Sequence, residues 1–485
     1  MIRKLIVKLF AICTLFMFLS YLFMPFQATA ITVTEEEEMG REFMKVVLKQ
    51  LEFIKDPVIV NYINKLGNKL LAFFPPQPFS YNFYLVREDV YNAFAGPGGH
   101  IFINSGLFQD MDNEEELAGI LAHEISHVAC RHISGRIEKS SKIGMMTLAG
   151  MLGGIFLGVG GAGTAAGALT IGSMAAGQSL SLAYSRENEM QADQLGLMYL
   201  TRAGYNGEGL LTMLNKIRNK QWFGTDLVPS YLMTHPAVED RIVYIDVWLA
   251  TNASKSLVKN KNIRPFAFER AHTRLLTVYG EEDVVLKKFR DEVAKNPSDP
   301  LAHYRYGMIL ARTGDRKNAI NHIKTALGKK VFDAYILKDL GITYFNDGRY
   351  EEALSVLNGV VSISGKDSET LYYIGRAQIE TGQYKESIKI FDELAGKDVY
   401  NKEALYFLGE AYGKQGYMGD AHYYLGTYYK KKNDRKNALF HLEKAVEHFK
   451  NDKDQDGKKI KIMEMIKELN IKNKRNIQKD KKSLT

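Results

Sequence analysis

Residues 113–132 of the chain read NEEELAGILAHEISHVACRH, and their pattern sets the architecture of the region around them. Apolar residues recur in this stretch at steps of three and four, the spacing that places them on one face of an α-helix. They are Leu117, Ile120, Leu121, Ile125 and Val128. The pattern predicts an amphipathic helix from Asn113 to His132.

The same stretch carries His123 and His127, which lie one helical turn apart with Glu124 beside the first of them. Residues four apart share a helix face, so both imidazoles can reach one tetrahedral zinc ion at about 2.0–2.1 Å. A glutamate in the middle of such a pair is the general base of many zinc peptidases. Two imidazoles do not complete a catalytic zinc site, which uses three protein ligands and one open position.

A candidate for the third ligand lies about sixty residues downstream, where Glu189–Asp193 begins another helical pattern. Asp193 stands one turn after Glu189, where it could accept the free ring N–H of a ligand histidine and so fix its tautomer. Glu187 is the competing ligand. Spacing favours Glu189, because only Glu189 stands four residues before an aspartate.

Short strands are predicted upstream of this helix. Residues 81–86 are rich in β-forming side chains, and residues 100–104 follow the turn sequence Gly96–Gly99. If the strand at 100–104 is an exposed sheet edge, it would hold an extended substrate by main-chain hydrogen bonds. An N-terminal helix is predicted to begin at Thr34, whose side chain would cap it ahead of four glutamates.

The second half of the chain is a repeat array with a period of 34 residues. Three series keep that spacing: Gly307, Gly341, Gly375, Gly409; Gly314, Gly348, Gly382, Gly416; and Ala319, Ala353, Ser387, Ala421. The period resembles the tetratricopeptide repeat, a stacked helix–turn–helix unit. We expect the array to span 282–449, with a capping helix starting at 437–439. Four tyrosines are candidates for its concave face, although most should pack in the core: Tyr372, Tyr373, Tyr406 and Tyr412.

The first thirty residues have the features of an export signal: cations at Arg3, Lys4 and Lys8, an apolar run, and small residues at 28–30. We expect cleavage after Ala30. An uncleaved anchor is the alternative, because the apolar run approaches the length that spans a bilayer. Cleavage would remove Cys13 and leave Cys130 without a disulfide partner, as a small buried hydrophobe rather than a metal ligand.

A chain of 485 residues is too long for one hydrophobic core. We therefore expect a signal peptide at 1–30, a peptidase domain at 31–270, a repeat array at 271–449 and a basic tail at 450–485, whose Lys-rich end from Lys458 to Lys482 forms a solvated helix. Much of the net charge of +8 lies in that tail, which has no aromatic residues among its lysines. This pattern excludes a nucleic-acid partner and favours solubility or weak attraction to anionic surfaces.

Residues 143–185 form a glycine-rich stretch without a charged residue. A membrane crossing there would separate His127 from Glu189, so the two could not share an ion. We expect a loop that moves over the site or contacts a membrane surface.

Together these motifs resemble peptidase family M48, in the exported subgroup that carries C-terminal tetratricopeptide repeats. The resemblance rests on Asn92–Ala95, Gly98–Ile103, His123–His127, Glu189–Asp193, Thr234–Pro236 and Arg241. It implies an α+β, mainly α, zincin-type domain with a small β-sheet, followed by an α-solenoid.

The same resemblance makes Glu189, not Glu187, the third ligand and places Asp193 behind a ligand histidine. It also places His235 beside the metal, where it contacts the substrate carbonyl or closes the site as a further ligand. We interpret His100 and His132 as structural.

The expected cofactor is one Zn²⁺ per chain, which would lower the pKa of a bound water to about 7. Glu124 would take the proton and pass it to the leaving amine. The expected function is periplasmic cleavage of misfolded or misassembled envelope proteins, with the repeats binding clients or an outer-membrane assembly complex. The alternative is an assembly factor or chaperone for outer-membrane proteins with a latent or regulated metal site.

Overall fold

The computed structural model describes residues 31–139, 184–223, 230–252, 265–328, 333–396, 400–450 and 452–482. The chain divides into two compact units, Met1–His272 and Thr273–Thr485. The predicted signal peptide and nearly all of the glycine-rich stretch at 143–185 lie outside the described residues. Within the described ranges, no helix combines the length and the apolar composition needed to cross a membrane.

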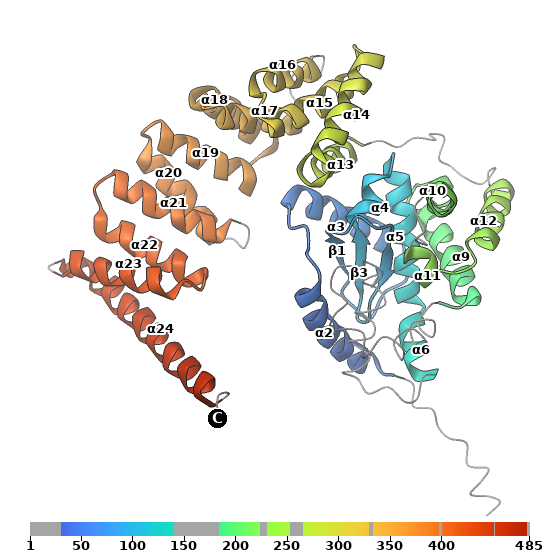
Figure 1. Ribbon diagram of the computed structural model, residues 1–485, viewed down its shortest axis with the longest axis horizontal. Coiled ribbons are helices and arrows are strands. Elements are labelled where there is room, and N and C mark those ends of the chain that lie inside the picture. Colours follow the sequence, from blue (N-terminus) through green and yellow to red (C-terminus); the bar gives the residue numbers. More distant parts are fainter. Residues whose placement is uncertain are drawn as a thin grey trace, which may run out of the picture. The chain divides into compact units, whose positions relative to one another are not determined.

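The first unit contains a three-stranded sheet (Figure 1). Strand β3 (His100–Asn104) lies in the centre, parallel to β1 (Asn82–Val86) and antiparallel to β2 (Ala93–Ala95). The condition for substrate binding at the strand 100–104, that it is an exposed edge, is therefore not met. The chain reverses between β2 and β3 through Gly98 and Gly99, whose φ angles of 73° and 85° suit glycine. The three-residue β2 is too short to give a periodic signal in the sequence.

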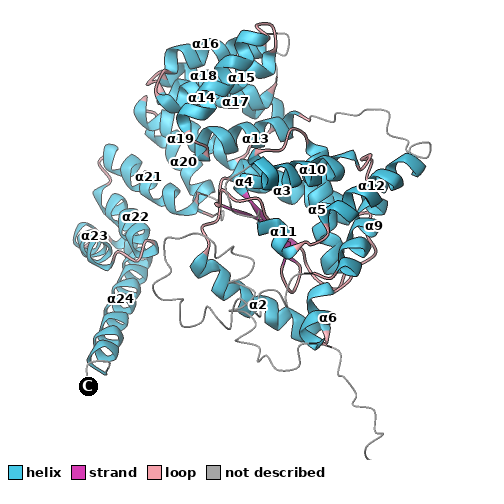
Figure 2. Cartoon of the chain, turned by 45° about the vertical axis from the view of Figure 1, so that its right-hand side comes forward, coloured by secondary structure: helices cyan, strands magenta, loops and turns pink. Residues whose placement is uncertain are grey.

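Helices surround this sheet (Figure 2). They are α2 (Val33–Gln50), α3 (Pro57–Leu71), α4 (Ser105–Gln109), α5 (Glu114–Ala129), α6 (His132–Lys139), α9 (Arg186–Arg202), α10 (Glu208–Phe223), α11 (Ser230–Thr234) and α12 (Val238–Asn252). Helix α2 packs Phe43 and Val47 against Phe94 and Phe102 of the sheet. Its N-cap is Thr32 rather than the predicted Thr34, because Thr32 and Glu35 form a reciprocal capping box.

Helix α5 is buried on all sides, which its amphipathic pattern did not predict. Every residue from Glu114 to Val128 is buried, because α3, α9, α10 and β2 all contact this helix. The acids of its first turn are paired by other elements. Glu114 accepts hydrogen bonds from the hydroxyls of Tyr62 and Tyr205, at 2.8 and 2.6 Å. Buried charges that are hydrogen-bonded in this way anchor the amino end of the helix.

Helix α13 (Phe266–Tyr279) contains the division between the two units, and the second unit continues as an α-solenoid of paired helices. These are α14 (Glu282–Lys295), α15 (Pro300–Thr313), α16 (Arg316–Leu327), α17 (Ala334–Asn346), α18 (Tyr350–Ser364), α19 (Ser368–Glu380), α20 (Tyr384–Ala395), α21 (Asn401–Lys414), α22 (Met418–Lys431) and α23 (Arg435–His448), followed by η2 (Lys453–Gln455) and α24 (Asp456–Lys482). The predicted fold class, a mainly helical α+β unit followed by a solenoid, is confirmed.

The 34-residue series have distinct physical causes. Gly314, Gly348, Gly382 and Gly416 end helices with φ between 77° and 92°, a conformation that favours glycine. At Gly307, Gly341, Gly375 and Gly409, an added Cβ would lie 2.7–2.9 Å from side chains of the partner helix. Most of the four candidate tyrosines are partly buried, whereas Tyr406 is 39% exposed.

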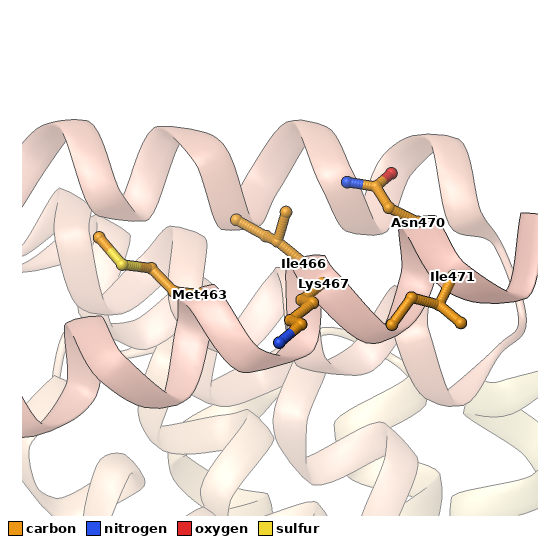
Figure 3. Close-up of a pocket in the computed structure, with 5 residues that line it drawn as sticks. All are labelled: Met463, Ile466, Lys467, Asn470 and Ile471. Carbon is orange, nitrogen blue, oxygen red and sulfur yellow. The ribbon is translucent and has the colours of Figure 1, made fainter.

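The Lys-rich end of the chain was predicted to be a solvated helix. The structure has a helix there, α24 (Asp456–Lys482), but the first half of this helix is not solvated on all sides. Helix α24 packs Ile462, Met465 and Leu469 against α23, where all three are buried. These apolar residues stand at helical spacing among many lysines, which masked them in the composition. Another face of α24 carries a shallow groove between exposed side chains (Figure 3).

Candidate active site

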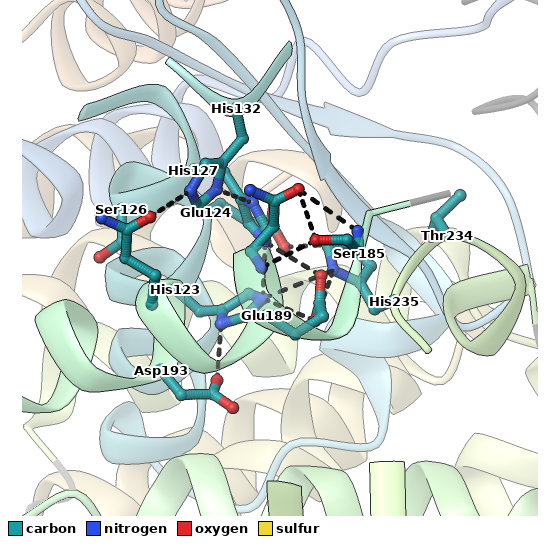
Figure 4. Close-up of polar contacts among 12 residues, drawn as sticks. His123, Glu124, Ser126, His127, His132, Ser185, Glu189, Asp193, Thr234 and His235 are labelled. Carbon is teal, nitrogen blue, oxygen red and sulfur yellow. Dashed lines mark hydrogen bonds and ion pairs between the residues drawn. The ribbon is translucent and has the colours of Figure 1, made fainter. Parts of the chain in front are cut away.

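Helices α5 and α9 bring the three predicted ligands together (Figure 4). His123 Nε2 lies 3.0 Å from His127 Nε2 and 3.5 Å from Glu189 Oε2. His127 Nε2 lies 3.4 Å from Glu189 Oε1. Atoms that coordinate a tetrahedral zinc ion at 2.0–2.1 Å lie about 3.3–3.4 Å apart. The residues present therefore fit such an ion in both chemistry and spacing.

Local sequence explains why the two helices meet at this level. Ser185 caps α9 with a box completed by Asn188, so that Glu189 stands in the first turn of the helix. Gly196 in α9 faces the backbone of Ala122, where an added Cβ would lie 3.3 Å from the carbonyl carbon. Glycine thus permits the close approach of α9 to the part of α5 that bears His123.

The second ring nitrogen of each histidine in the group is also engaged. His123 Nδ1 lies 2.8 Å from Asp193 Oδ1, as the spacing argument expected. His127 Nδ1 lies 2.9 Å from Nδ1 of His132. His235 Nε2 donates to the carbonyl oxygen of Ala93 at 3.2 Å. Such contacts fix the tautomer and leave the other nitrogen free to bind a metal.

His132 is a site residue that the sequence reasoning missed. Its Nε2 lies 3.0 Å from Gln191 Oε1, and because an amide oxygen only accepts, this nitrogen carries the proton. Its Nδ1 must then accept a hydrogen bond from His127. The contact depends on the turn at Arg131, whose φ of 52° no spacing rule predicts. His100, by contrast, hydrogen-bonds the Tyr84 hydroxyl and stands outside the ligand group.

The buried charge of the site is balanced by Arg241. Its Nε and Nη2 donate to Asp193 at 2.7 and 2.8 Å, and its Nη1 lies 2.7 Å from Glu189 Oε2. Burial opposes ionisation of Asp193, but the charges of Arg241 and His123 outweigh it and lower the pKa. Burial also opposes ionisation of Glu189. His235 and Arg241 outweigh this effect and lower the pKa of Glu189 well below its usual range. Both carboxylates are therefore charged and able to face a cation.

Glu124 is buried beside the ligands, and within the described residues neither of its carboxylate oxygens has a hydrogen-bond partner. The Nε2 atom of His235 lies 3.6 Å from Oε1 of Glu124. Burial raises the pKa of this carboxyl group above its ordinary value. A buried carboxylate without a protein donor implies a further polar group at this point, and a water molecule on the metal fits that requirement.

His235 follows α11 and closes the group of potential ligands. Its Nδ1 lies 3.1 Å from Glu189 Oε1 and 3.4 Å from His123 Nε2, so four residues offer ligand atoms to one point. The ring of Tyr231 stacks on His235 with centroids 4.3 Å apart, and the ring of Tyr184 stacks on His127 at 3.7 Å. Both tyrosines are buried and confine the imidazoles.

The alternative ligands considered from the sequence lie elsewhere. Glu187 is exposed in the first turn of α9 and is not part of the ligand group. Cys130 ends α5, is partly buried, and its thiol pKa is raised to about 11 by burial. A thiol with a raised pKa is a poor metal ligand, because the thiolate is the form that binds.

A buried helix with the His-Glu-x-x-His pattern, a glutamate from a second helix and an unpartnered carboxylate define a metallopeptidase-type domain. Residues 61–249 match the model of peptidase family M48, and residues 344–399 match a tetratricopeptide repeat model. The domain around the buried histidines is therefore a peptidase family M48 domain, which confirms the resemblance seen in the sequence.

Individual known proteins are similar to parts of the chain. The beta-barrel assembly-enhancing protease of Yersinia pestis is 30% identical over 281 residues, which cover 58% of this chain and 56% of that protein. The mitochondrial metalloendopeptidase OMA1 of Schizosaccharomyces pombe is 26% identical over 197 residues, covering 39% of this chain and 52% of that protein. The chain thus spans about half the length of these relatives. Among solved structures, the tetratricopeptide repeat protein YrrB is 18% identical over 34% of this chain and 95% of its own, with a TM-score of 0.27.

Proposed function

We propose that this chain is an exported zinc-dependent endopeptidase. The observation that carries the proposal is the convergence of His123, His127 and Glu189 on one point beside Glu124, whose oxygens accept no hydrogen bond from the described residues. Three ligands of these types and a neighbouring carboxylate are the donor set of a catalytic zinc site. The names of the relatives, a protease and a metalloendopeptidase, support the same reaction class.

Bound zinc would supply the charge that acidifies a water molecule to a pKa of about 7 and polarises a peptide carbonyl. Glu124, buried beside the ligand residues, would accept the proton of that water, and its raised pKa would suit proton exchange nearer to neutral pH. The same carboxyl group then protonates the leaving amine. Asp193 and His132 keep the ligand imidazoles oriented during these steps.

Substrate binding is proposed at strand β2. Because β3 is paired on both sides, and no strand of the described residues pairs with the other side of β2, an extended polypeptide would add to β2 by main-chain hydrogen bonds once the groups that bury this strand move aside. His235 contacts this strand through the Ala93 carbonyl oxygen. Since its Nδ1 shares the ligand position with the other three residues, His235 would have to withdraw before a substrate carbonyl could take that place.

We place the protein in the periplasm, because residues 1–30 have the features of an export signal. Its proposed clients are misfolded or misassembled envelope proteins, which the repeats would bind directly or through an outer-membrane assembly complex. The name of the Yersinia relative, which refers to β-barrel assembly, supports this class of client. Tetratricopeptide solenoids present extended surfaces for protein binding.

A second candidate function is an assembly factor whose metal site is latent or regulated. The position of His235 among the ligands favours it, because four protein ligands would leave no open coordination position. The peptidase and the assembly factor can be distinguished with a variant that binds zinc but lacks the general base. Such a variant would be inactive as a peptidase but could still act as an assembly factor.

Glu124→Gln provides that protein. The variant should keep its zinc content and its fold, yet lose the cleavage of an unfolded protein substrate, because an amide cannot accept the proton. Glu187→Gln, at an exposed glutamate outside the site, is the matched control and should cleave normally. Unchanged cleavage by Glu124→Gln would refute the peptidase assignment. In cells that lack the wild type, full rescue by Glu124→Gln would favour the assembly role.

A further inference from the structure

Helix α24 has two apolar faces, and only one of them is covered. Ile462, Met465 and Leu469 are buried against α23. On another side of the helix, Ile460 is 61% exposed, Met463 56% and Ile471 43%. A helix that only capped the solenoid would need one apolar face, because its outer surface faces water.

The second apolar face forms a continuous stripe. Ile460, Met463, Lys467 and Ile471 follow one another at steps of three and four, so they share one side of the helix. A shallow groove on this side is lined by Met463, Ile466, Lys467, Asn470 and Ile471 (Figure 3). Lysine within such a stripe is compatible with an apolar contact, because its methylene stem lies along the surface while the amine reaches water or anions.

Polar contacts hold α24 so that this stripe stays outward. Lys458 pairs with Asp420 of α22 near the start of α24. Farther along, Arg435 of α23 donates to the Leu469 carbonyl at 3.1 Å and to the Asn470 side chain at 2.8 Å. Rotation of the helix to bury the stripe would break these contacts and expose Ile462 and its neighbours.

The net positive charge of α24 indicates which kind of partner would cover the apolar stripe. Residues 456–482 contain ten lysines and arginines and four acids, so ten minus four gives +6 of the chain's net +8. Two of the acids are paired with lysines: Asp456 with Lys459 at 2.6 Å and Glu468 with Lys430 at 2.7 Å. Two copies of so basic a helix would repel each other, which disfavours self-association through this face. An apolar stripe on a strongly cationic helix fits an anionic lipid surface.

We propose that the outer face of α24 binds the surface of anionic membranes, with Ile460, Met463 and Ile471 entering the headgroup region and Lys467, within the stripe, contacting lipid phosphates. The helix lies on the membrane and does not cross it. Binding here would hold the repeat array at the membrane surface, whether or not the first unit is an active peptidase.

The test uses the chain from Ile31 to its end, because the apolar residues before it could bind lipid themselves. It measures sedimentation with vesicles of phosphatidylglycerol and phosphatidylcholine in equal parts, and with pure phosphatidylcholine. The wild type should bind the anionic vesicles, release in high salt, and bind the neutral vesicles weakly. The triple variant Ile460→Ser, Met463→Ser, Ile471→Ser should lose about tenfold or more of the affinity. All three side chains are exposed, so its melting temperature should not change.

Two further variants separate the outcomes. A variant with Lys472→Glu, Lys474→Glu and Arg475→Glu keeps the apolar stripe but reverses local charge, and it should also bind the anionic vesicles more weakly than the wild type. Val243→Ser with Val247→Ser removes two exposed apolar residues of α12 and should bind like the wild type. Binding that survives the triple serine change would overturn the proposal. So would self-association of the wild type that disappears in the triple variant, since the stripe would then serve a second copy or another protein.

Discussion

At the scale of single residues, the site depends on which nitrogen of each imidazole carries a proton. Gln191 accepts the proton of His132 Nε2, which leaves His132 Nδ1 to accept from His127. His127 Nε2 then faces the ligand group without a proton. Burial lowers the pKa of His127 well below its usual value, which also keeps the ring neutral and able to bind a cation.

This arrangement predicts that His132→Ala weakens zinc binding by about 10–100-fold without removing a ligand. The loss arises because His127 is no longer held in the metal-binding tautomer. Competition with a chromophoric chelator measures the affinity. His100→Ala is the matched control, since His100 is a partly buried histidine with one hydrogen-bond partner outside the group, and its zinc affinity should equal that of the wild type. Equal affinities of all three proteins would show that His132 has no orienting role.

The raised pKa of Glu124 predicts the pH at which activity is lost on the acidic side of the pH profile. A general base must be ionised, so kcat/KM should fall as the pH drops through the pKa of this group. Because burial raises that pKa above 4.5, activity should be lost at a higher pH than an ordinary glutamate allows. The profile is measured with zinc content determined at each pH, so that metal loss is distinguished from protonation. A limb at or below the ordinary value, with zinc retained, would contradict the assigned role.

The sequence predicted the site residues that lie near one another because they are one helical turn apart. His123 with His127, and Glu189 with Asp193, each stand four residues apart on one helix, and the structure places all four together. The role of His132 depends on a left-handed turn, and that of Ala93 on a three-residue strand. Such contacts arise from tertiary packing, which a periodic pattern does not encode.

At the scale of elements, the position of α5 is set by the glycines of its neighbours. An added Cβ on Gly209, near the start of α10, would lie 2.2 Å from the carbonyl group of Glu115. That contact is with backbone, which cannot move aside as a flexible side chain can. Helix α10 therefore approaches the amino end of α5 only because residue 209 has no side chain.

Gly209→Ala should destabilise the first unit by about 1–3 kcal/mol or more, because α10 must shift away from α5. Urea unfolding, followed by the fluorescence of the first unit, measures the change. Gly135→Ala in α6 is the control: among the residues that the structure describes, nothing lies within 4 Å of its added Cβ, and alanine favours a helix. It should be neutral or stabilising by up to about 1 kcal/mol. Similar effects of the two substitutions would mean that the close α5–α10 contact does not limit stability.

Helices with a long periodic pattern in the sequence were predicted. A very short strand, and a helix whose apolar residues stand among many lysines, were not fully predicted. The repeat helices could be predicted from the spacing of glycine and alanine. The structure explains this spacing by the turns that end the helices and by the close contacts between paired helices. Strand β2 was missed because three residues give no alternation, and without it the sequence left open whether β3 is an edge. The buried face of α24 was missed because lysines dominate its composition.

At the scale of the whole molecule, the chain consists of two compact units, and all the candidate ligands lie in the first. A ligand stabilises only the cooperative unit that binds it, by about 4 kcal/mol at a thousandfold excess over Kd. Calorimetry should therefore show two unfolding transitions, of which a zinc chelator lowers only one. Glu189→Gln should shift the same transition and make it insensitive to the chelator. A single transition, or an equal shift of both, would show that the units do not unfold independently.

The most direct test of the metal centre is the zinc content of the purified, folded chain, measured by elemental analysis beside Glu189→Gln and the exposed-site control Glu187→Gln. One zinc per chain is expected in the wild type and in Glu187→Gln, and a large loss in Glu189→Gln, because only Glu189 meets the two histidines. Folded wild-type protein without stoichiometric zinc, or full zinc in Glu189→Gln, would contradict the account.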